Sequence, residues 1–302
     1  MKITGFSLKN LAVLTLYACS VLCAANAGAT EGGGGSSPLG AEGVMSAALP
    51  PPGFYYLNYL THYSADRLND KNGNKLPVDF HVGATADVSR FVYMTNYHLL
   101  GGLFGVYAVV PLVHVSATIG GVGNTTSGVG DMTFSPFMLS WHGKSLWHAA
   151  TAIEFTAPTG SYDKSRLANV GRNYWTFQPI VNVTLLTESG LDLTTKIMYD
   201  INTENTDTHY TSGHEFHFDY ASTYHWGAWN IGATGYFYKQ VTKDHGAGAG
   251  ANGGNKGQVF AVGPTVKYSY KNMSLEAKYQ KEMLAENKAE GDRYWLKLIW
   301  AF

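Results

Sequence analysis

The carboxyl end of the chain carries the pattern that most restricts its fold. Over the last nine residues every second side chain is large and either aliphatic or aromatic, and Lys297 lies among the alternate ones. A side-chain period of two indicates a β-strand whose two faces meet different environments. A strand of this kind that ends on an aromatic residue is typical of bacterial outer-membrane barrels. We therefore expect five residues to form the signal that the barrel-assembly machinery reads: Tyr294, Leu296, Leu298, Trp300 and Phe302.

The amino-terminal residues predict a secretory signal peptide over residues 1–27. Lys2 and Lys9 give the segment a positive start, and residues 11–22 are apolar. Residues 25–27 (Ala-Asn-Ala) or 27–29 (Ala-Gly-Ala) offer a cleavage site. The apolar stretch is too short for a stable membrane span. We therefore expect the chain to be exported across the inner membrane of its cell.

Removal of this peptide changes the chemistry that the mature chain can carry. Cys19 and Cys23 are the only cysteines, and both lie in the predicted signal peptide, so neither disulfide nor thiol chemistry is expected. Two lysines are lost as well, which leaves 19 basic against 22 acidic residues and a net charge of −3. That balance does not favour a nucleic-acid partner.

Composition separates the remaining classes of fold. No run of eighteen apolar residues follows the signal peptide, so no transmembrane helix is expected. The chain nevertheless has 20 Tyr, 14 Phe and 7 Trp, and only 14% of its residues are charged. Apolar residues that are abundant but spread over alternate positions are typical of a membrane β-barrel. A secreted β-sandwich is the alternative, although it would normally carry more charge and shorter strands.

Twelve segments read as strands, joined by connections that alternate between short and long. Barrels of the outer membrane have an even number of antiparallel strands, short periplasmic turns and long external loops. Six long and five short connections place both termini in the periplasm of a Gram-negative bacterium, and 118–128 is one of the expected external loops. The expected strands form a barrel over residues 54–302: 54–65, 78–97, 102–117, 129–140, 146–157, 173–185, 191–203, 214–225, 229–241, 257–269, 273–284 and 292–302.

The alternation also assigns the faces of several strands. In 214–225, Phe216 and Phe218 alternate with Glu215, His217 and Asp219. A charge on the lipid face costs roughly 2–4 kcal/mol at the bilayer midplane, so the charged face should line the lumen. There it would set charge selectivity and hold water or a solute hydroxyl. The residues expected to face the lumen and the solute are Lys196, Asp200, Glu215, His217, Asp219, Lys267, Glu276 and Lys278.

The opposite part of the barrel is less polar. Strands 102–117 and 129–140 carry almost no charge on either face, so either register would place apolar side chains inside. These residues could form an apolar lumen wall suited to a hydrophobic solute, or they could pack against an internal plug. The pattern favours neither interpretation.

A candidate plug precedes the first strand. Residues 28–53 begin with a glycine run and end in Pro-Pro-Pro-Gly. Ser37 followed by Pro38 resembles a helix cap with proline at the first helical position, so a short helix is expected to run on to Leu49. Such a segment could occlude the narrow bore of a twelve-stranded barrel. A disordered periplasmic tail is the alternative, given the glycine content.

A series of Gly- and Pro-containing motifs resembles a known family. The resemblance runs from about residue 50 to the end of the chain, and the order and spacing of the motifs carry it. The motifs are Gly53-Phe54-Tyr55-Tyr56, Leu100-Gly101-Gly102, Pro111, Gly128-Val129-Gly130-Asp131 with Pro136, Pro158-Thr159-Gly160-Ser161-Tyr162 and Asn169-Val170-Gly171-Arg172-Asn173-Tyr174-Trp175. They resemble the outer-membrane proteins linked to the meta pathway of phenol degradation (the SphA-like family). The resemblance implies an outer-membrane channel for aromatic or other hydrophobic compounds, and it carries no set of binding residues.

These observations lead to one expected function and two alternatives. We expect a passive channel whose partners are outer-membrane lipid, the barrel-assembly machinery and a small hydrophobic or aromatic solute. A structural or adhesion barrel with a filled lumen is the first alternative, and a barrel enzyme is a weaker one. Glu215, His217 and Asp219 share a face and could bind a cation or exchange protons, but a hydrogen-bonded lumenal network is the simpler interpretation. No serine–histidine motif is evident, so no enzymatic activity, cofactor or metal is expected.

Overall fold

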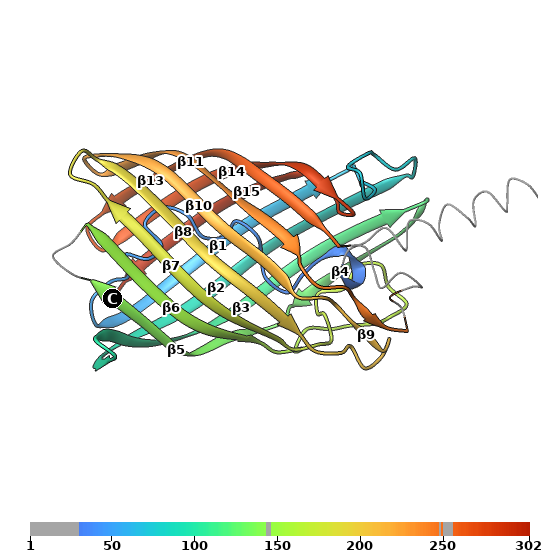
Figure 1. Cartoon of the computed structure of the whole chain (residues 1–302), viewed down its shortest axis with the longest axis horizontal. Helices are drawn as coiled ribbons and strands as arrows, with labels where there is room; N and C mark the ends of the chain where they lie inside the picture. Colours follow the sequence, from blue (N-terminus) through green and yellow to red (C-terminus); the bar gives the residue numbers. More distant parts are fainter. Residues whose placement is uncertain (1–29, 143–145, 248, 250–255) are drawn as a thin grey trace, which may run out of the picture.

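The protein is a closed antiparallel β-barrel in its computed structural model (Figure 1). The structure describes residues 30–142, 146–247, 249 and 256–302. Within these residues twelve strands form the ring, so the predicted twelve-stranded barrel is confirmed. In ring order they are β1 (Gly53–Ala65), β2 (Phe80–Leu99), β3 (Gly102–Ile119), β5 (Thr133–His142), β6 (Trp147–Thr156), β7 (Thr176–Leu186), β8 (Leu191–Asn202), β10 (Glu215–Trp226), β11 (Trp229–Gln240), β13 (Gln258–Tyr270), β14 (Met273–Glu286) and β15 (Asp292–Ala301).

The ring closes between its first and last strands. β1 pairs with β15 over ten residues, from Tyr55 opposite Ala301 to Ser64 opposite Asp292. Every strand of the ring therefore has a hydrogen-bonded neighbour on both sides. Closure of this kind is what lets strands cross lipid, since an open edge would leave backbone groups without partners. No helix in the described residues is long and apolar enough to cross a membrane.

The two faces of the ring differ in the way that strand alternation requires. On β8, Leu191 and Ile197 are 40% and 39% exposed on the outer surface, whereas Asp192 and Asp200 are 4% and 1% exposed. Exposed aromatic residues also gather at the end of the barrel where β15 finishes, as expected for a girdle at the membrane–water interface. They include Phe54, Trp226, Trp229, Tyr268, Tyr270 and Trp300.

One expected external loop is instead a strand. Segment 118–128 was expected to be irregular, but β3 continues to Ile119 and pairs with β4 (Val122–Val129). Gly120 and Gly121 join them with φ of 59° and 80°, and two positive φ values in a two-residue turn favour a tight β-hairpin. The prediction is therefore wrong here, because two adjacent glycines make the turn short where a long loop was assumed.

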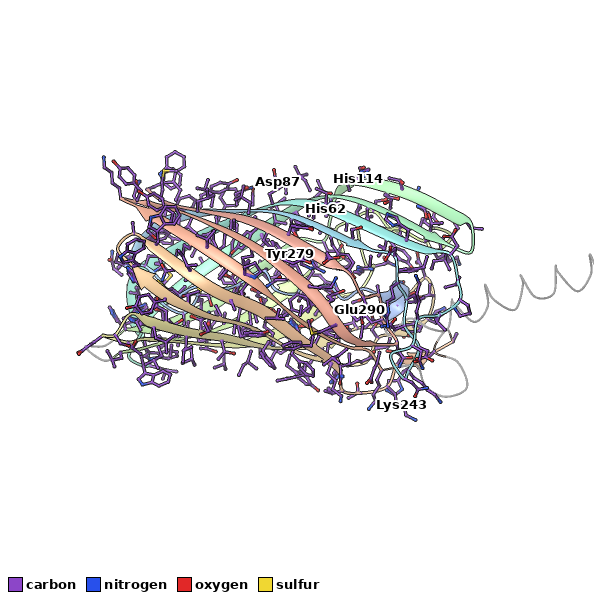
Figure 2. The ribbon with its side chains drawn as sticks, turned by 90° about the horizontal axis from the view of Figure 1, so that it is seen from above. His62, Asp87, His114, Lys243, Tyr279 and Glu290 are labelled. Carbon is purple, nitrogen blue, oxygen red and sulfur yellow. The ribbon has the colours of Figure 1, made fainter. Side chains whose placement is uncertain are left out.

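The start of β2, the end of β3 and β4 project beyond the rim of the barrel at the end opposite Phe302 (Figure 1). The outer face of this extension is polar. There the His114 ring lies 2.6 Å from the Ser127 hydroxyl, which comes from β4 (Figure 2). Polar side chains on an outer face fit a sheet that has left the apolar lipid band.

A second loop covers the free edge of β4. The amide of Asn124 accepts hydrogen bonds from the backbone N–H groups of Leu167 and Ala168. After β4, the carboxylate of Asp131 accepts hydrogen bonds from the backbone N–H groups of Gly160 and Arg172, at 2.8 and 2.7 Å. An uncovered strand edge would invite pairing with another chain, so these contacts protect the extension.

Candidate functional site

Residues 30–52 run lengthwise through the lumen (Figure 1). At one end, the Glu31 carboxylate accepts hydrogen bonds from Thr208 at 2.6 Å and from Asn205 at 2.8 Å, both in the loop between β8 and β10. At the other end, Gly53 begins β1 beside Phe302, whose N–H donates to Phe54. The described chain therefore begins and ends at opposite ends of the barrel.

The expectation that both termini lie on the periplasmic side stays a prediction, because residues 1–29 lie outside the described residues. The strand count correctly places the start of β1 and the end of β15 at the same end of the barrel. The segment before β1 then returns through the lumen, so that Glu31 lies at the far rim. The number of strands carries no information about a segment outside them, so it did not predict that Glu31 lies at the far rim.

Residues 40–42, in the middle of the segment, are bound by charged side chains of the barrel wall. Asp219 accepts the backbone N–H groups of Gly40 and Glu42 at 2.8 and 2.9 Å. The Lys278 ammonium donates to the carbonyls of Gly40 and Ala41, both at 2.8 Å. Backbone groups without partners inside a barrel would be costly, and here the wall supplies those partners.

Residues 45–47, nearer to β1, are bound in the same way by neutral side chains of the wall. Thr194 accepts the N–H of Met45 at 3.2 Å, and Thr184 accepts that of Ala47 at 3.1 Å. Because the wall takes these backbone donors, the segment forms turns and extended stretches. The helix expected from Ser37 to Leu49 is therefore absent, and that prediction is wrong. Gly40 and Met45, at φ of 75° and 61°, also interrupt helical geometry.

A charged cluster lies at the centre of the lumen around Glu42. Its carboxylate accepts a hydrogen bond from Lys297 at 2.5 Å and one from Arg90 at 2.9 Å. Tyr59 adds a third at 3.1 Å. Burial alone would raise the pKa of the Glu42 carboxyl, but Lys297, Lys196 and Arg90 together hold this pKa well below its ordinary value. Glu42 is therefore ionised at neutral pH.

Three of the residues expected in the lumen form a second cluster. His217 lies 3.2 Å from Asp200, and Gln178 contacts both side chains. Glu215 accepts a hydrogen bond from Asn202 at 3.4 Å. All three expected residues are 2% exposed or less. The described residues contain no group of three or more side chains arranged to hold a metal ion.

The other five expected residues fall into two sets. Asp219, Lys278 and Glu276 contact the lumen segment, the last of these through the N–H of Val44 at 3.4 Å. Lys196 and Lys267 line a cavity that lies between Glu42 and the Phe302 end of the barrel. All eight side chains thus lie on the inner face, but the structure does not bring them together at one place. Their role in selecting a solute stays a prediction.

Sequence reasoning missed the residues at the centre of the lumen. Glu42, Arg90 and Lys297 were not among the expected residues. Lys297 could have been found, because it alternates with Leu296 and Leu298 and must face inward if they face lipid. Glu42 gave no such signal, since its segment has no strand periodicity.

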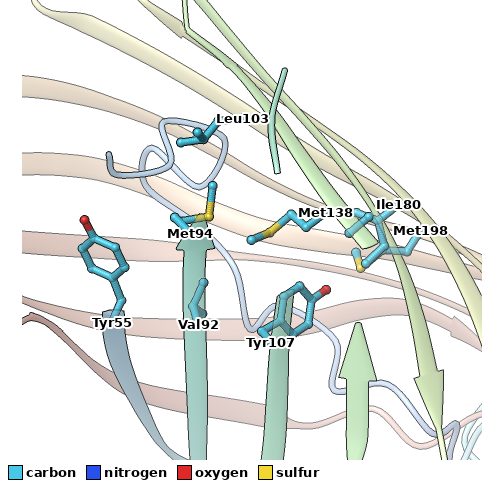
Figure 3. Close-up of a cluster of buried hydrophobic side chains, with 9 residues drawn as sticks. Tyr55, Val92, Met94, Leu103, Tyr107, Met138, Ile180 and Met198 are labelled. Carbon is cyan, nitrogen blue, oxygen red and sulfur yellow. The ribbon is translucent and has the colours of Figure 1, made fainter. Parts of the chain in front are cut away.

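An apolar cluster covers the inner wall on the less polar side (Figure 3). Its members come from strands β1 to β8, and Leu49 of the lumen segment packs against them. Part of this apolar wall packs against the lumen segment, and part of it lines a cavity. The wall therefore combines the two arrangements considered from the sequence, contact with an internal plug and an apolar lining of the lumen. The buried members are Tyr55, Val92, Met94, Leu103, Tyr107, Met138, Ala152, Ile180 and Met198.

A cavity lies between Glu42 and the rim at the Phe302 end. Its volume is about 330 Å³, and it extends to Lys271 in the turn between β13 and β14. Leu57 and Ile180 contribute to its apolar wall. A smaller cavity of about 80 Å³ lies on the other side, and both cavities share Glu42, Arg90 and Lys196. The charged cluster therefore separates two hollow parts of the lumen.

Comparison with known proteins places this geometry among outer-membrane barrels. A family model described as "Putative MetA-pathway of phenol degradation" matches residues 65–298. The crystal structure of an outer membrane channel from Pseudomonas putida F1 superposes with a TM-score of 0.75 at 16% identity and covers 89% of this chain and 100% of that one. The translocator domain of the autotransporter NalP from Neisseria meningitidis gives a TM-score of 0.50 at 8% identity, covering 84% and 90%. A search of curated proteins found no match. At these identities the structural likeness shows the fold alone.

Proposed function

Since the chain belongs to the family described as "Putative MetA-pathway of phenol degradation", we propose that it is a passive channel of the Gram-negative outer membrane. Its solutes would be small hydrophobic or aromatic compounds. The end of the barrel that carries Phe302 would face the periplasm, and the projecting β3–β4 hairpin would face outward. The signal peptide and the assembly role of the last strand belong to the same proposal.

One observation carries this proposal: a closed barrel holds a lumenal cavity with an apolar wall. Val92, Met138 and Ile180 line the cavity of about 330 Å³. Apolar walls with a few polar groups are typical of small-molecule sites. A solute that enters from outside would pass the charged cluster at Glu42 and leave at the rim near Lys271. Transport of this kind needs only a concentration gradient.

A filled, non-conducting barrel is the second candidate. The hydrogen bonds between residues 30–52 and the wall favour it, because they run along the lumen from Glu31 to Ala47. A barrel of this kind would act through its external loops. The channel proposal requires the segment to move or to leave a side path for the solute.

Conductance and uptake measurements distinguish the two candidates. The purified, refolded protein would be inserted into planar bilayers, and uptake of labelled phenol would be followed in liposomes. A channel gives small, steady openings or protein-dependent phenol uptake. A protein that is shown to be folded by heat-modified gel mobility, and yet gives neither signal, would establish the filled barrel instead.

A further inference from the structure

We propose that the larger lumen cavity binds a small apolar molecule that carries a carboxylate, with the apolar part on the wall and the carboxylate between Lys196 and Lys267. This inference rests on the proposed function, because it names the class of solute for the same lumen. It differs from that function in requiring a negative charge on the solute.

The surface of the cavity carries an excess of positive charge. Arg90, Lys196, Lys267 and Lys297 line it, whereas Glu42 is the one acidic residue among its described lining residues. Lys271 adds a further positive charge at the rim. A cleft lined by charge of one sign raises the local concentration of ions of the opposite sign.

Two of these cations already have a partner and two do not. Arg90 and Lys297 share the Glu42 carboxylate, at 2.9 and 2.5 Å. Among the described residues, neither the Lys196 nor the Lys267 ammonium forms an ion pair or a hydrogen bond with another side chain. Lys267 is only 9% exposed, so little water can compensate for a missing partner. A buried cation that no carboxylate contacts directly is costly, and an anion bound at hydrogen-bond distance would reduce that cost.

The acids nearest to Lys267 are engaged elsewhere. The carboxylate of Glu276 accepts hydrogen bonds from the N–H of Val44 at 3.4 Å and from Thr265 at 3.3 Å. Asp192 accepts a hydrogen bond from Asn230 at 2.5 Å. Within the described residues neither carboxylate forms an ion pair with the Lys267 ammonium, which lines the cavity.

The rest of the cavity suits an apolar body. Leu57, Val92 and Ile180 lie on its wall, together with Leu49 from the lumen segment. The volume of about 330 Å³ lies near the lower end of the range of small-molecule sites, roughly 300–1,000 Å³. Positive charge at one side and an apolar wall at the other therefore match an aromatic carboxylate better than a neutral aromatic or a simple anion.

Equilibrium binding to the full-length protein in detergent micelles tests this inference. Three probes of known structure would be titrated calorimetrically: benzoate, its neutral analogue benzamide, and acetate, which has the charge without the ring. We expect benzoate to bind at least about tenfold more tightly than either of the others, and to weaken as salt is raised. Equal affinity for benzoate and benzamide, or for benzoate and acetate, would overturn the inference, as would the absence of any binding.

Matched variants locate the site. Lys267→Gln and Lys196→Gln should each reduce the preference for benzoate over benzamide severalfold, whereas Lys267→Arg should retain it. Lys243→Gln removes the same charge from an exposed external loop and should leave the preference unchanged. An unchanged preference in both cavity variants would also overturn the assignment. If a cavity variant does not fold, the comparison of the three probes on the unaltered protein still decides.

Uptake of phenol into liposomes separates this inference from the proposed function. Phenol uptake with equal binding of benzoate and benzamide would retain the channel and reject the anion site. Selective benzoate binding without uptake of either phenol or benzoate would retain the site and reject the channel.

Discussion

Glu42 joins two strands that are far apart in the chain, because Arg90 of β2 and Lys297 of β15 both donate to its carboxylate. The pair of cations would repel each other without it. The backbone N–H of Glu42 is also bound by Asp219, so the residue fixes the lumen segment to three positions on the wall. A single side chain therefore couples the segment to the barrel.

Replacement of this residue should loosen the segment. Glu42→Gln leaves two buried cations without a counter-charge, and we expect the free energy of unfolding to fall by roughly 2–5 kcal/mol, as for the loss of one partner from a buried charge pair. Urea titration of the refolded protein would measure this loss. Glu188→Gln, in the exposed turn between β7 and β8, is the control and should change the free energy little. An equal effect in the two variants would show that the Glu42 cluster does not hold the segment.

The same residue predicts a dependence on pH. The pKa of the Glu42 carboxyl in the folded protein is lowered well below the ordinary value of 4.5, because the attraction of Lys297, Lys196 and Arg90 outweighs the effect of burial. A lowered pKa contributes stability that is complete above the ordinary value and is lost as the pH falls through the lower, folded value. The unaltered protein should therefore lose more stability on acidification below 4.5 than Glu42→Gln does. Parallel urea titrations at a series of acidic pH values would show parallel losses if Glu42 were not the titrating group.

At the scale of elements, the lumen segment and the projecting hairpin are the two departures from a plain barrel. The segment forms no α-helix, because wall side chains such as Thr184, Thr194 and Asp219 accept its backbone N–H groups. The β3–β4 hairpin exists because Gly120 and Gly121 permit a two-residue turn. In both cases, contacts with other elements or backbone geometry decided what local residue preferences had left open.

Deletion of the segment should open the lumen. A protein that lacks residues 31–50 loses every hydrogen bond from Glu31 to Ala47, so we expect its single-channel conductance to rise severalfold above that of the unaltered protein. Heat-modified gel mobility and circular dichroism would first establish that the shortened barrel still folds. A folded deletion protein with unchanged conductance would show that the segment does not limit ion flow.

At the scale of the whole molecule, the barrel is held by its closing seam. β1 and β15 pair in continuous register, and Phe302 extends that seam by donating its N–H to Phe54. The centroid of the Phe302 ring also lies 5.0 Å from the ring centroid of Trp300 and 5.6 Å from that of Phe54. Aromatic pairs of this kind contribute about 0.5–1.5 kcal/mol beyond their buried area.

Replacement of Phe302 should therefore impair assembly. Phe302→Ser removes both ring contacts and the aromatic end of the strand, and we expect several-fold less heat-modifiable barrel in the outer-membrane fraction of cells. Phe302→Tyr retains the ring and should accumulate normally. Normal levels of folded barrel in the serine variant would contradict the role given to this residue.

The sequence by itself determined the class of fold and most of its strands. Strict alternation, as in Leu296-Lys297-Leu298, requires a strand between two environments, and spacing between turn residues determines how many such strands the chain can form. The family resemblance is borne out by the match over residues 65–298. These properties are local, so a single sequence contains them.

Only the tertiary structure decided what fills the barrel. Glu42 reaches Lys297 across 255 positions of the chain, and no periodicity relates the two residues. The path of residues 30–52, and with it the place where the described chain begins, depends on which wall side chains accept its backbone donors. Strand alternation says which way a side chain points but not which partner it meets across the lumen, because that partner is set by closure of the whole ring.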